Sequence, residues 1–138
     1  MYVRDAMSTA VLTAGPEHTL RDVARRMTAR SVGAAVVIDE QQAGPGIITE
    51  RDILCSLGSD EAPDQELVRD HLTENAILAA PDWSLEQAAS EMVRGGFRHV
   101  IVVDAGDVVG ILSMRDIVSA WTTDAASSEL VVGGAVGN

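Results

Sequence analysis

Apolar residues recur with helical spacing in two stretches of the sequence. Residues 20–27 and 85–92 both place them at the first, fourth, fifth and eighth positions, as Leu20, Val23, Ala24 and Met27, and as Leu85, Ala88, Ala89 and Met92. This spacing predicts two amphipathic helices, each with one buried face. Thr19 and Ser84 come directly before these stretches and are the expected helix starts.

Uniformly apolar, β-branched runs follow each predicted helix. AAVVID (34–39) and VIVVD (100–104) are typical of strands covered on both faces. Short extended stretches, VLT (11–13) and ILA (77–79), precede the helices, and a second short strand ends near Ile48 or Leu112, where a closing helix follows. The predicted order is therefore strand, helix, strand, strand, helix, written twice.

The two copies are related residue by residue. Residue n matches residue n+65 over the first part of each copy, so that Val3-Arg4-Asp5 matches Val68-Arg69-Asp70. A length difference in the loop after Asp39 reduces the offset to 64, as expected for a surface loop. We predict a mixed α/β (α+β) protein of two β-α-β-β-α units packed through their sheets with pseudo-twofold symmetry. The predicted boundaries are 1–57 for the first unit, 58–66 for a linker, 67–123 for the second unit and 124–138 for a flexible C-terminal tail.

Each copy ends in a similar motif, GIITERD (46–52) or GILSMRD (110–116). The spacing Thr49-x-x-Asp52, repeated as Ser113-x-x-Asp116, is that of a helix capping box with Asp in place of Glu, so capping alone is one interpretation. The glycines Gly46 and Gly110 either let another group approach the backbone closely or permit a turn.

The arginines of the motif favour a second interpretation. Arg51 and Arg115 put a cation in the first turn of a helix, where the helix dipole makes it unfavourable by roughly 0.3–1 kcal/mol, unless each pairs with a nearby carboxylate. Free helix N–H groups, a hydroxyl and an arginine can together hold a phosphate, and the aspartate can accept hydrogen bonds from a vicinal diol. A ribose phosphate offers both groups.

Composition excludes several classes of protein. A formal charge of −11 would repel nucleic acids and anionic membranes, and the absence of lysine excludes phosphate-binding P-loops and Schiff-base catalysis. The three histidines have no metal-ligand spacing with Cys55 or with each other, so we expect no metal, and we expect Cys55 to be a buried, inert thiol. Without a signal peptide or membrane span, a soluble cytoplasmic protein is expected. The sequence supplies no nucleophile paired with a base and no metal cluster, so no catalytic activity is expected.

The tandem copies, the VRDAM and VRDHL segments, the P-x-x-[TS]-L helix starts and the two G-h-h-[ST]-x-x-D motifs resemble a pair of cystathionine-β-synthase-type (CBS) domains, a Bateman module. The resemblance covers nearly residues 1–123. It implies a non-catalytic sensor for signal transduction that binds AMP, ADP, ATP or S-adenosylmethionine in clefts between the units and requires no cofactor.

The resemblance also implies roles for individual residues. Asp52 and Asp116 would contact ribose, and Thr13 and Ala79 would lie beside the base or sugar. The residues on the phosphate side would be Thr49, Arg51, Ser113 and Arg115, with Arg98 and His99 in the second copy alone. The first copy has Gly33 and Ala34 at that place, so the two sites are expected to be unequal.

The expected partners are a second copy of the chain, in a homodimer, and a regulated protein that is a separate chain. The alternative interpretation is a ligand-free structural or protein-interaction dimer, in which the motifs serve only as helix caps. Neither interpretation involves nucleic acid or a membrane.

Overall fold

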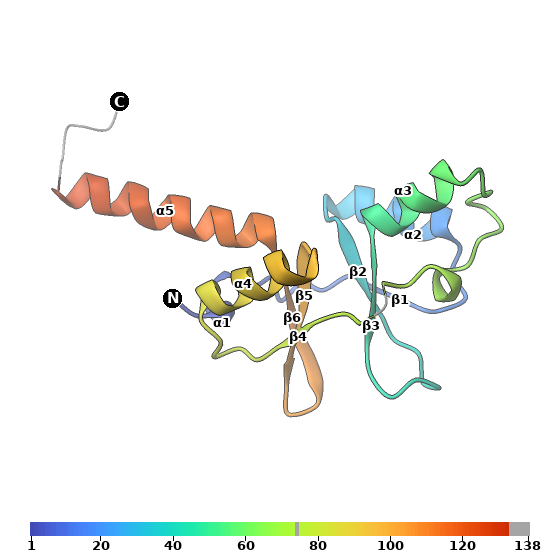
Figure 1. Cartoon of the computed structure of the whole chain (residues 1–138), viewed down its shortest axis with the longest axis horizontal. Coiled ribbons are helices and arrows are strands. Elements are labelled where there is room, and N and C mark those ends of the chain that lie inside the picture. Colours follow the sequence, from blue (N-terminus) through green and yellow to red (C-terminus); the bar gives the residue numbers. More distant parts are fainter. Residues whose placement is uncertain (74, 133–138) are drawn as a thin grey trace. The chain divides into compact units, whose positions relative to one another are not determined.

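The computed structural model of the chain describes residues 1–73 and 75–132 (Figure 1). Within these residues it is a mixed α/β protein with two three-stranded sheets, β1-β2-β3 and β4-β5-β6. The predicted mixed α/β class is confirmed.

The first sheet and its helices follow the predicted order. The elements are β1 (Thr13–Ala14), α2 (Leu20–Arg30), β2 (Ala34–Val37), β3 (Gly46–Thr49) and α3 (Glu50–Gly58). The central strand β2 is parallel to β1 and antiparallel to β3. All four residues of β2 are buried, as its apolar sequence predicts.

The second sheet repeats this arrangement. Its elements are β4 (Leu78–Ala79), α4 (Leu85–Gly95), β5 (His99–Asp104), β6 (Asp107–Ser113) and α5 (Met114–Val132). A two-residue turn with positive φ at Ala105 and Gly106 joins β5 to β6. Helix α5 continues to Val132, so residues 124–132, which the sequence placed in the C-terminal tail, are helical, and the rest of that tail lies outside the described residues.

The helices begin where the sequence predicts. The hydroxyls of Thr19 and Ser84 accept hydrogen bonds from the backbone N–H groups of Asp22 (3.2 Å) and Gln87 (3.0 Å) and so cap α2 and α4. The residues with helical spacing that are buried are Leu20, Val23 and Met27 in α2, and Leu85, Ala88 and Met92 in α4. Local capping and the apolar face therefore specify both helices.

Helix α3 differs from expectation at Cys55. Its buried residues are Ile53 and Ser56, which are three positions apart and share one face. Cys55 lies off that face and is exposed, so the prediction of a buried thiol is wrong. The apolar pair at 53 and 54 suggested a wider buried face than the helix has, since Leu54 is also exposed.

The compact units of the structure do not coincide with the repeats of the sequence, because each unit contains the first residues of the other repeat. The two repeats thus exchange their leading segments. One unit consists of Ala10–Ile77, called here the β1–β3 unit. The other, the β4–β6 unit, combines Met1–Thr9 with the chain from Leu78 onward. The short helix α1 (Val3–Ala6) thus belongs with the second sheet, and the 3₁₀ helix η1 (Val68–Asp70) with the first.

Backbone hydrogen bonds hold both exchanged segments in the same way. In the β1–β3 unit, Val68 N–H donates to the carbonyl of His18 (2.9 Å), and Arg69 N–H donates to that of Pro16 (2.9 Å). In the β4–β6 unit, Val3 N–H donates to Trp83 (2.8 Å) and Arg4 N–H to Pro81 (3.0 Å). The two valine side chains are fully buried, so each core contains a valine from the other repeat.

The motif glycines lie where these segments cross the sheets. A Cβ atom added to Gly110 would lie 2.6 Å from Met7 Sδ and 3.0 Å from the carbonyl oxygen of Ser8. At Gly46 the nearest atom would be Leu72 Cδ1, at 3.3 Å. Close approach of the protein's own chain therefore accounts for both glycines.

Replacing Gly110 by alanine is expected to destabilise the protein by about 1–3 kcal/mol, because the added methyl group is opposed by backbone as well as by Met7. The matched change Gly46→Ala should cost less than about 1 kcal/mol, since the tip of the Leu72 side chain can move. Urea unfolding followed by circular dichroism measures both free energies. Equal losses for the two variants would contradict the difference in packing.

Candidate functional site

The two motifs form the junctions between strand and helix. Strand β3 ends at Thr49, where α3 begins, and β6 ends at Ser113, where α5 begins. Thr49 has an extended backbone (φ −117°) and is the N-cap residue of α3. The predicted strand end and helix start are confirmed in both copies.

Asp52 closes a capping box with Thr49. Its Oδ2 atom accepts hydrogen bonds from the backbone N–H (2.8 Å) and the hydroxyl (3.0 Å) of Thr49. The N–H of Asp52 donates in return to Thr49 Oγ1 (3.3 Å). These bonds fix the carboxylate at the start of α3, where the helix dipole favours negative charge.

Asp116 forms the same arrangement at the start of α5. Ser113 N–H donates to Asp116 Oδ2 (2.8 Å), and Asp116 N–H donates to Ser113 Oγ (2.9 Å). The capping interpretation is therefore confirmed for both motifs. Capping does not exclude a ligand, because a carboxylate has about four acceptor sites and these bonds use only one of its oxygens.

Thr73 adds a donor to Asp52 that the sequence analysis missed. Its hydroxyl donates to Asp52 Oδ2 (2.7 Å), and its N–H bonds the carbonyl of Ile47 (3.0 Å). The matching residue in the other copy is Ser8, which exchanges two backbone hydrogen bonds with Ile111. A hydroxyl residue at both repeat positions was the signal that could have identified this position.

Arg98 and His99 lie beside the second motif. His99 pairs with Ser113 across β5 and β6, and the carbonyl of Arg98 accepts a hydrogen bond from Met114 N–H (2.8 Å) at the first turn of α5. In the first copy, Gly33 and Ala34 occupy the same places relative to Glu50 and Thr49. The second motif thus has a polar residue at each of these two neighbouring positions, His99 at the start of β5 and Arg98 directly before it.

Arg51 and Arg115 are exposed at the first turns of α3 and α5. The ion pairs in the described part of the chain involve Arg21, Arg26, Arg69 and Arg94, but neither motif arginine. The alternative in which each motif arginine simply neutralises a nearby carboxylate is therefore not seen. Their charge remains available to an anionic group.

Thr13 and Ala79 lie on the first strand of each sheet, separated from the motif strand by the central strand. Thr13 pairs with Val36 and is exposed, whereas Ala79 pairs with Val102 and is only 2% exposed. Thr13 can offer a hydroxyl to a ligand. Ala79 has no polar group in its side chain, and the strand registers match Thr13 with Leu78, so Thr13 and Ala79 are not equivalent positions of the repeat.

Asp116 also lines a groove of about 410 Å³ in the β4–β6 unit, between the start of the chain and α5. The groove is lined by Met1, Asp5, Ala6, Asp116, Ser119, Ala120 and Thr123. Hydroxyl and carboxylate groups dominate the polar part of this lining, which suits a diol better than a phosphate.

Comparison with known proteins assigns the chain to a family. The family model described as CBS domain matches it twice, over residues 3–59 and 68–122. The chain belongs to the CBS domain family. The resemblance inferred from the repeated motifs is confirmed, and the two matches follow the two copies in the sequence.

Several curated proteins are similar to this chain over most of its length. The chain is 31% identical over 129 residues to the CBS domain-containing protein YhcV of Bacillus subtilis, covering 93% of this chain and 91% of YhcV. It is 30% identical over 131 residues to the uncharacterized protein MJ1225 of Methanocaldococcus jannaschii, covering 95% of this chain and 46% of that protein. The chain thus spans about half the length of some curated relatives that it matches.

Two similar solved structures contain adenosyl ligands. The CBS domain pair of protein MJ0100, in complex with 5′-methylthioadenosine and S-adenosyl-L-methionine, is 25% identical, with a TM-score of 0.80 over 90% of this chain and 98% of that one. Protein PAE2072 of Pyrobaculum aerophilum, complexed with AMP, is 26% identical, with a TM-score of 0.76 over 89% and 99% of the two chains.

Across residues 1–73 and 75–132, no helix combines the length and apolar character needed to cross a membrane.

Replacing Thr73 by valine is expected to lower the free energy of unfolding by about 1–2 kcal/mol, because the change removes a hydrogen bond to the Asp52 carboxylate and preserves the shape of the side chain. The matched change Ser8→Ala in the other copy should cost little, since the bonds of Ser8 to Ile111 are made by its backbone. Chemical denaturation of both variants measures the difference. A Thr73→Val variant as stable as the native chain would show that this hydroxyl contributes nothing to the cap.

Proposed function

We propose that this protein is a non-catalytic sensor that binds an adenine nucleotide or a related adenosyl compound at its two motifs. The observation that carries the proposal is the geometry at the start of α3 and α5. Each helix presents a capped aspartate next to an exposed arginine that forms no ion pair in the described part of the chain. Membership of the CBS domain family and the adenosyl ligands of MJ0100 and PAE2072 support the choice of ligand class.

In this proposal different residues contact different parts of the ligand. Asp52 and Asp116 accept hydrogen bonds from the ribose hydroxyls, while Thr49, Arg51, Ser113 and Arg115 bind phosphate or another anionic group. Thr13 and Ala79 lie beside the base or sugar. Two or three charge-assisted bonds per site, each worth about 1.5–3 kcal/mol, suffice for micromolar to millimolar binding after the cost of association.

The two sites are proposed to be unequal. Arg98 and His99 add polar side chains next to Ser113 in the second copy, where the first copy has Gly33 and Ala34. In the first copy, Thr73 already donates to Asp52, so a ribose hydroxyl has to share or displace that donor. Both differences favour tighter binding at Asp116 than at Asp52.

Isothermal titration calorimetry with AMP, ADP, ATP and S-adenosylmethionine at millimolar concentration tests the proposal. Asp116→Asn is expected to weaken the tighter site roughly tenfold or more, because asparagine retains an acceptor for the cap but loses the charge. Asp52→Asn should weaken the other site. Asp22→Asn removes the same charge near the start of α2 and is the matched control.

Absence of heat with all four compounds would contradict the proposed ligand class. The rival interpretation, a ligand-free structural or protein-interaction dimer, is supported by the internal hydrogen bonds of both motif aspartates. It predicts a melting temperature that none of these compounds raises, because a ligand that binds only the folded state must raise it.

We also propose that two copies of the chain form a homodimer through helices that carry exposed apolar side chains. Those on α3 to α5 are Leu54 (68% exposed), Leu57 (47%), Val93 (74%), Val118 (55%) and Trp121 (42%). Burial of such apolar side chains in an interface between two copies would favour association. The proposal does not depend on a bound ligand.

Size-exclusion chromatography with light scattering is expected to give twice the chain mass of 14.5 kDa. Leu54→Glu should shift the protein toward the monomer, because dimerisation would bury an unpaired charge. Ile38→Glu makes the same kind of change at an exposed residue outside these helices and should leave the dimer intact. The native chain eluting as a monomer at tens of micromolar would refute the dimer.

A further inference from the structure

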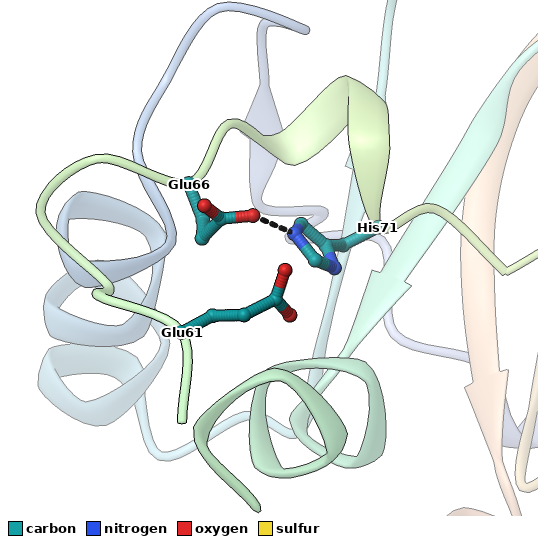
Figure 2. A group of neighbouring side chains, drawn as sticks. All are labelled: Glu61, Glu66 and His71. Atoms are coloured by element: carbon teal, nitrogen blue, oxygen red, sulfur yellow. Dashed lines mark hydrogen bonds and ion pairs between the residues drawn. The ribbon is translucent and has the colours of Figure 1, made fainter. Parts of the chain in front are cut away.

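Three potential metal ligands converge in the chain that follows α3. Glu61 lies just after the helix, Glu66 before η1, and His71 directly after η1. Figure 2 shows that both carboxylates and the imidazole point toward one another. One ligand atom from each residue can be chosen so that all three atoms lie within 4.8 Å of one another.

The fold holds these side chains in place. The hydroxyl of Ser56, the only buried polar side chain among the described residues, donates to Glu61 Oε1 (2.9 Å). The backbone N–H of Glu61 bonds the carbonyl of Ser56 (3.2 Å), and Leu20 N–H donates to the carbonyl of Glu66 (3.0 Å). The Glu61 carboxylate and the backbone of both glutamates are therefore anchored to helices of the same unit, which lowers the entropy cost of binding an ion.

The cluster is partly shielded from water and rich in negative charge. The side chains of His71 and Glu66 are 15% and 28% exposed, and His71 Nε2 lies 2.7 Å from Glu66 Oε1. Hydrogen bonding with His71, and to a lesser extent with Glu61, lowers the pKa of the Glu66 carboxyl below its ordinary value. Two carboxyl groups this close to one another favour a cation between them.

We propose that Glu61, Glu66 and His71 bind one divalent first-row transition-metal ion, with Zn²⁺ as the best match. One imidazole and two carboxylates are ligands that Zn²⁺ accepts, whereas Mg²⁺ and Ca²⁺ prefer oxygen ligands alone. Tetrahedral bonds of 2.0–2.1 Å place neighbouring ligand atoms about 3.3 Å apart. Small side-chain rotations reach that spacing from the observed one, with water as the fourth ligand.

Binding requires one proton to move. His71 Nε2 lies 2.7 Å from Glu66 Oε1, and in the neutral tautomer that carries its N–H on Nε2 the ring donates a hydrogen bond to that carboxylate. When the metal binds, that hydrogen bond opens, Nε2 presents its lone pair to the ion, and the ring proton lies on Nδ1. The ion then connects Glu66 and His71, on the two sides of η1, to Glu61, which follows α3. All three residues belong to the β1–β3 unit.

Calorimetric titration of the full chain, first stripped of metal with a chelator, tests this site. We expect one Zn²⁺ per chain, with much weaker binding of Mg²⁺ and Ca²⁺. His71→Gln and Glu61→Gln should each lower Zn²⁺ affinity at least roughly tenfold, the minimum loss seen when a group supporting a metal ligand is removed. Glutamine at position 61 can still accept the hydrogen bond of Ser56, so Glu61→Gln decides the result if His71→Gln fails to fold.

Two matched variants separate this cluster from general attraction to an acidic protein. Glu17→Gln removes the same charge as Glu61→Gln at a glutamate that contacts Arg69 instead. His18→Gln removes a histidine that faces a single carboxylate, Asp22, at 3.9 Å. Both variants should bind Zn²⁺ as the native chain does.

Nuclear magnetic resonance of the imidazole rings gives an independent measurement, because the chain has only three histidines. Zn²⁺ should shift the ring signals of His71 and leave those of His18 and His99 unchanged. No Zn²⁺ binding, or equal weakening by the control variants, would overturn the proposal. Neither result bears on nucleotide binding, since no residue of this cluster belongs to the proposed nucleotide sites.

Discussion

The exchange of leading segments is the constraint on which both units depend. The five elements of one copy do not supply N–H donors for two carbonyl groups in the turn before the first long helix. They also lack one side chain of the core. Val68 and Arg69 supply the missing N–H groups and side chain to the β1–β3 unit, and Val3 and Arg4 supply them to the β4–β6 unit. A core side chain and these hydrogen bonds come from the other copy, so neither copy is complete without a segment of the other.

The hydrogen bonds of the motif aspartates stabilise the helix starts and also hold the carboxylates in place for the proposed ligand. Capping fixes the position of the carboxylate at the positive end of a helix, and a fixed carboxylate loses little entropy when it binds a diol. The same segments that complete the cores also pass over the motif glycines, and Thr73 reaches Asp52 from one of them. A shift of this leading segment can therefore move Asp52 of the motif through the hydrogen bond of Thr73.

The parts of the fold predicted from sequence are those specified by local patterns. Helix starts at Thr19 and Ser84, the buried strand β2 and the capping boxes depend on neighbours within a few residues. The exchange was not predicted, because the repeat aligns Val3 with Val68 and does not show which copy each of them joins. The spacing of histidines and cysteine does not predict the cluster of Glu61, Glu66 and His71, because two of its three potential ligands are carboxylates.

The exchange also constrains the order of events during synthesis. Residues 1–9 are made before the β1–β3 unit, but their partners, from Leu78 onward, are made after it. The β1–β3 unit becomes complete once residue 77 has emerged, whereas the opening segment, with fully buried Val3, has to wait for the rest of the chain. Because domains generally fold as units while the chain is made, residues 1–9 are among the last parts of the two units to reach their native contacts.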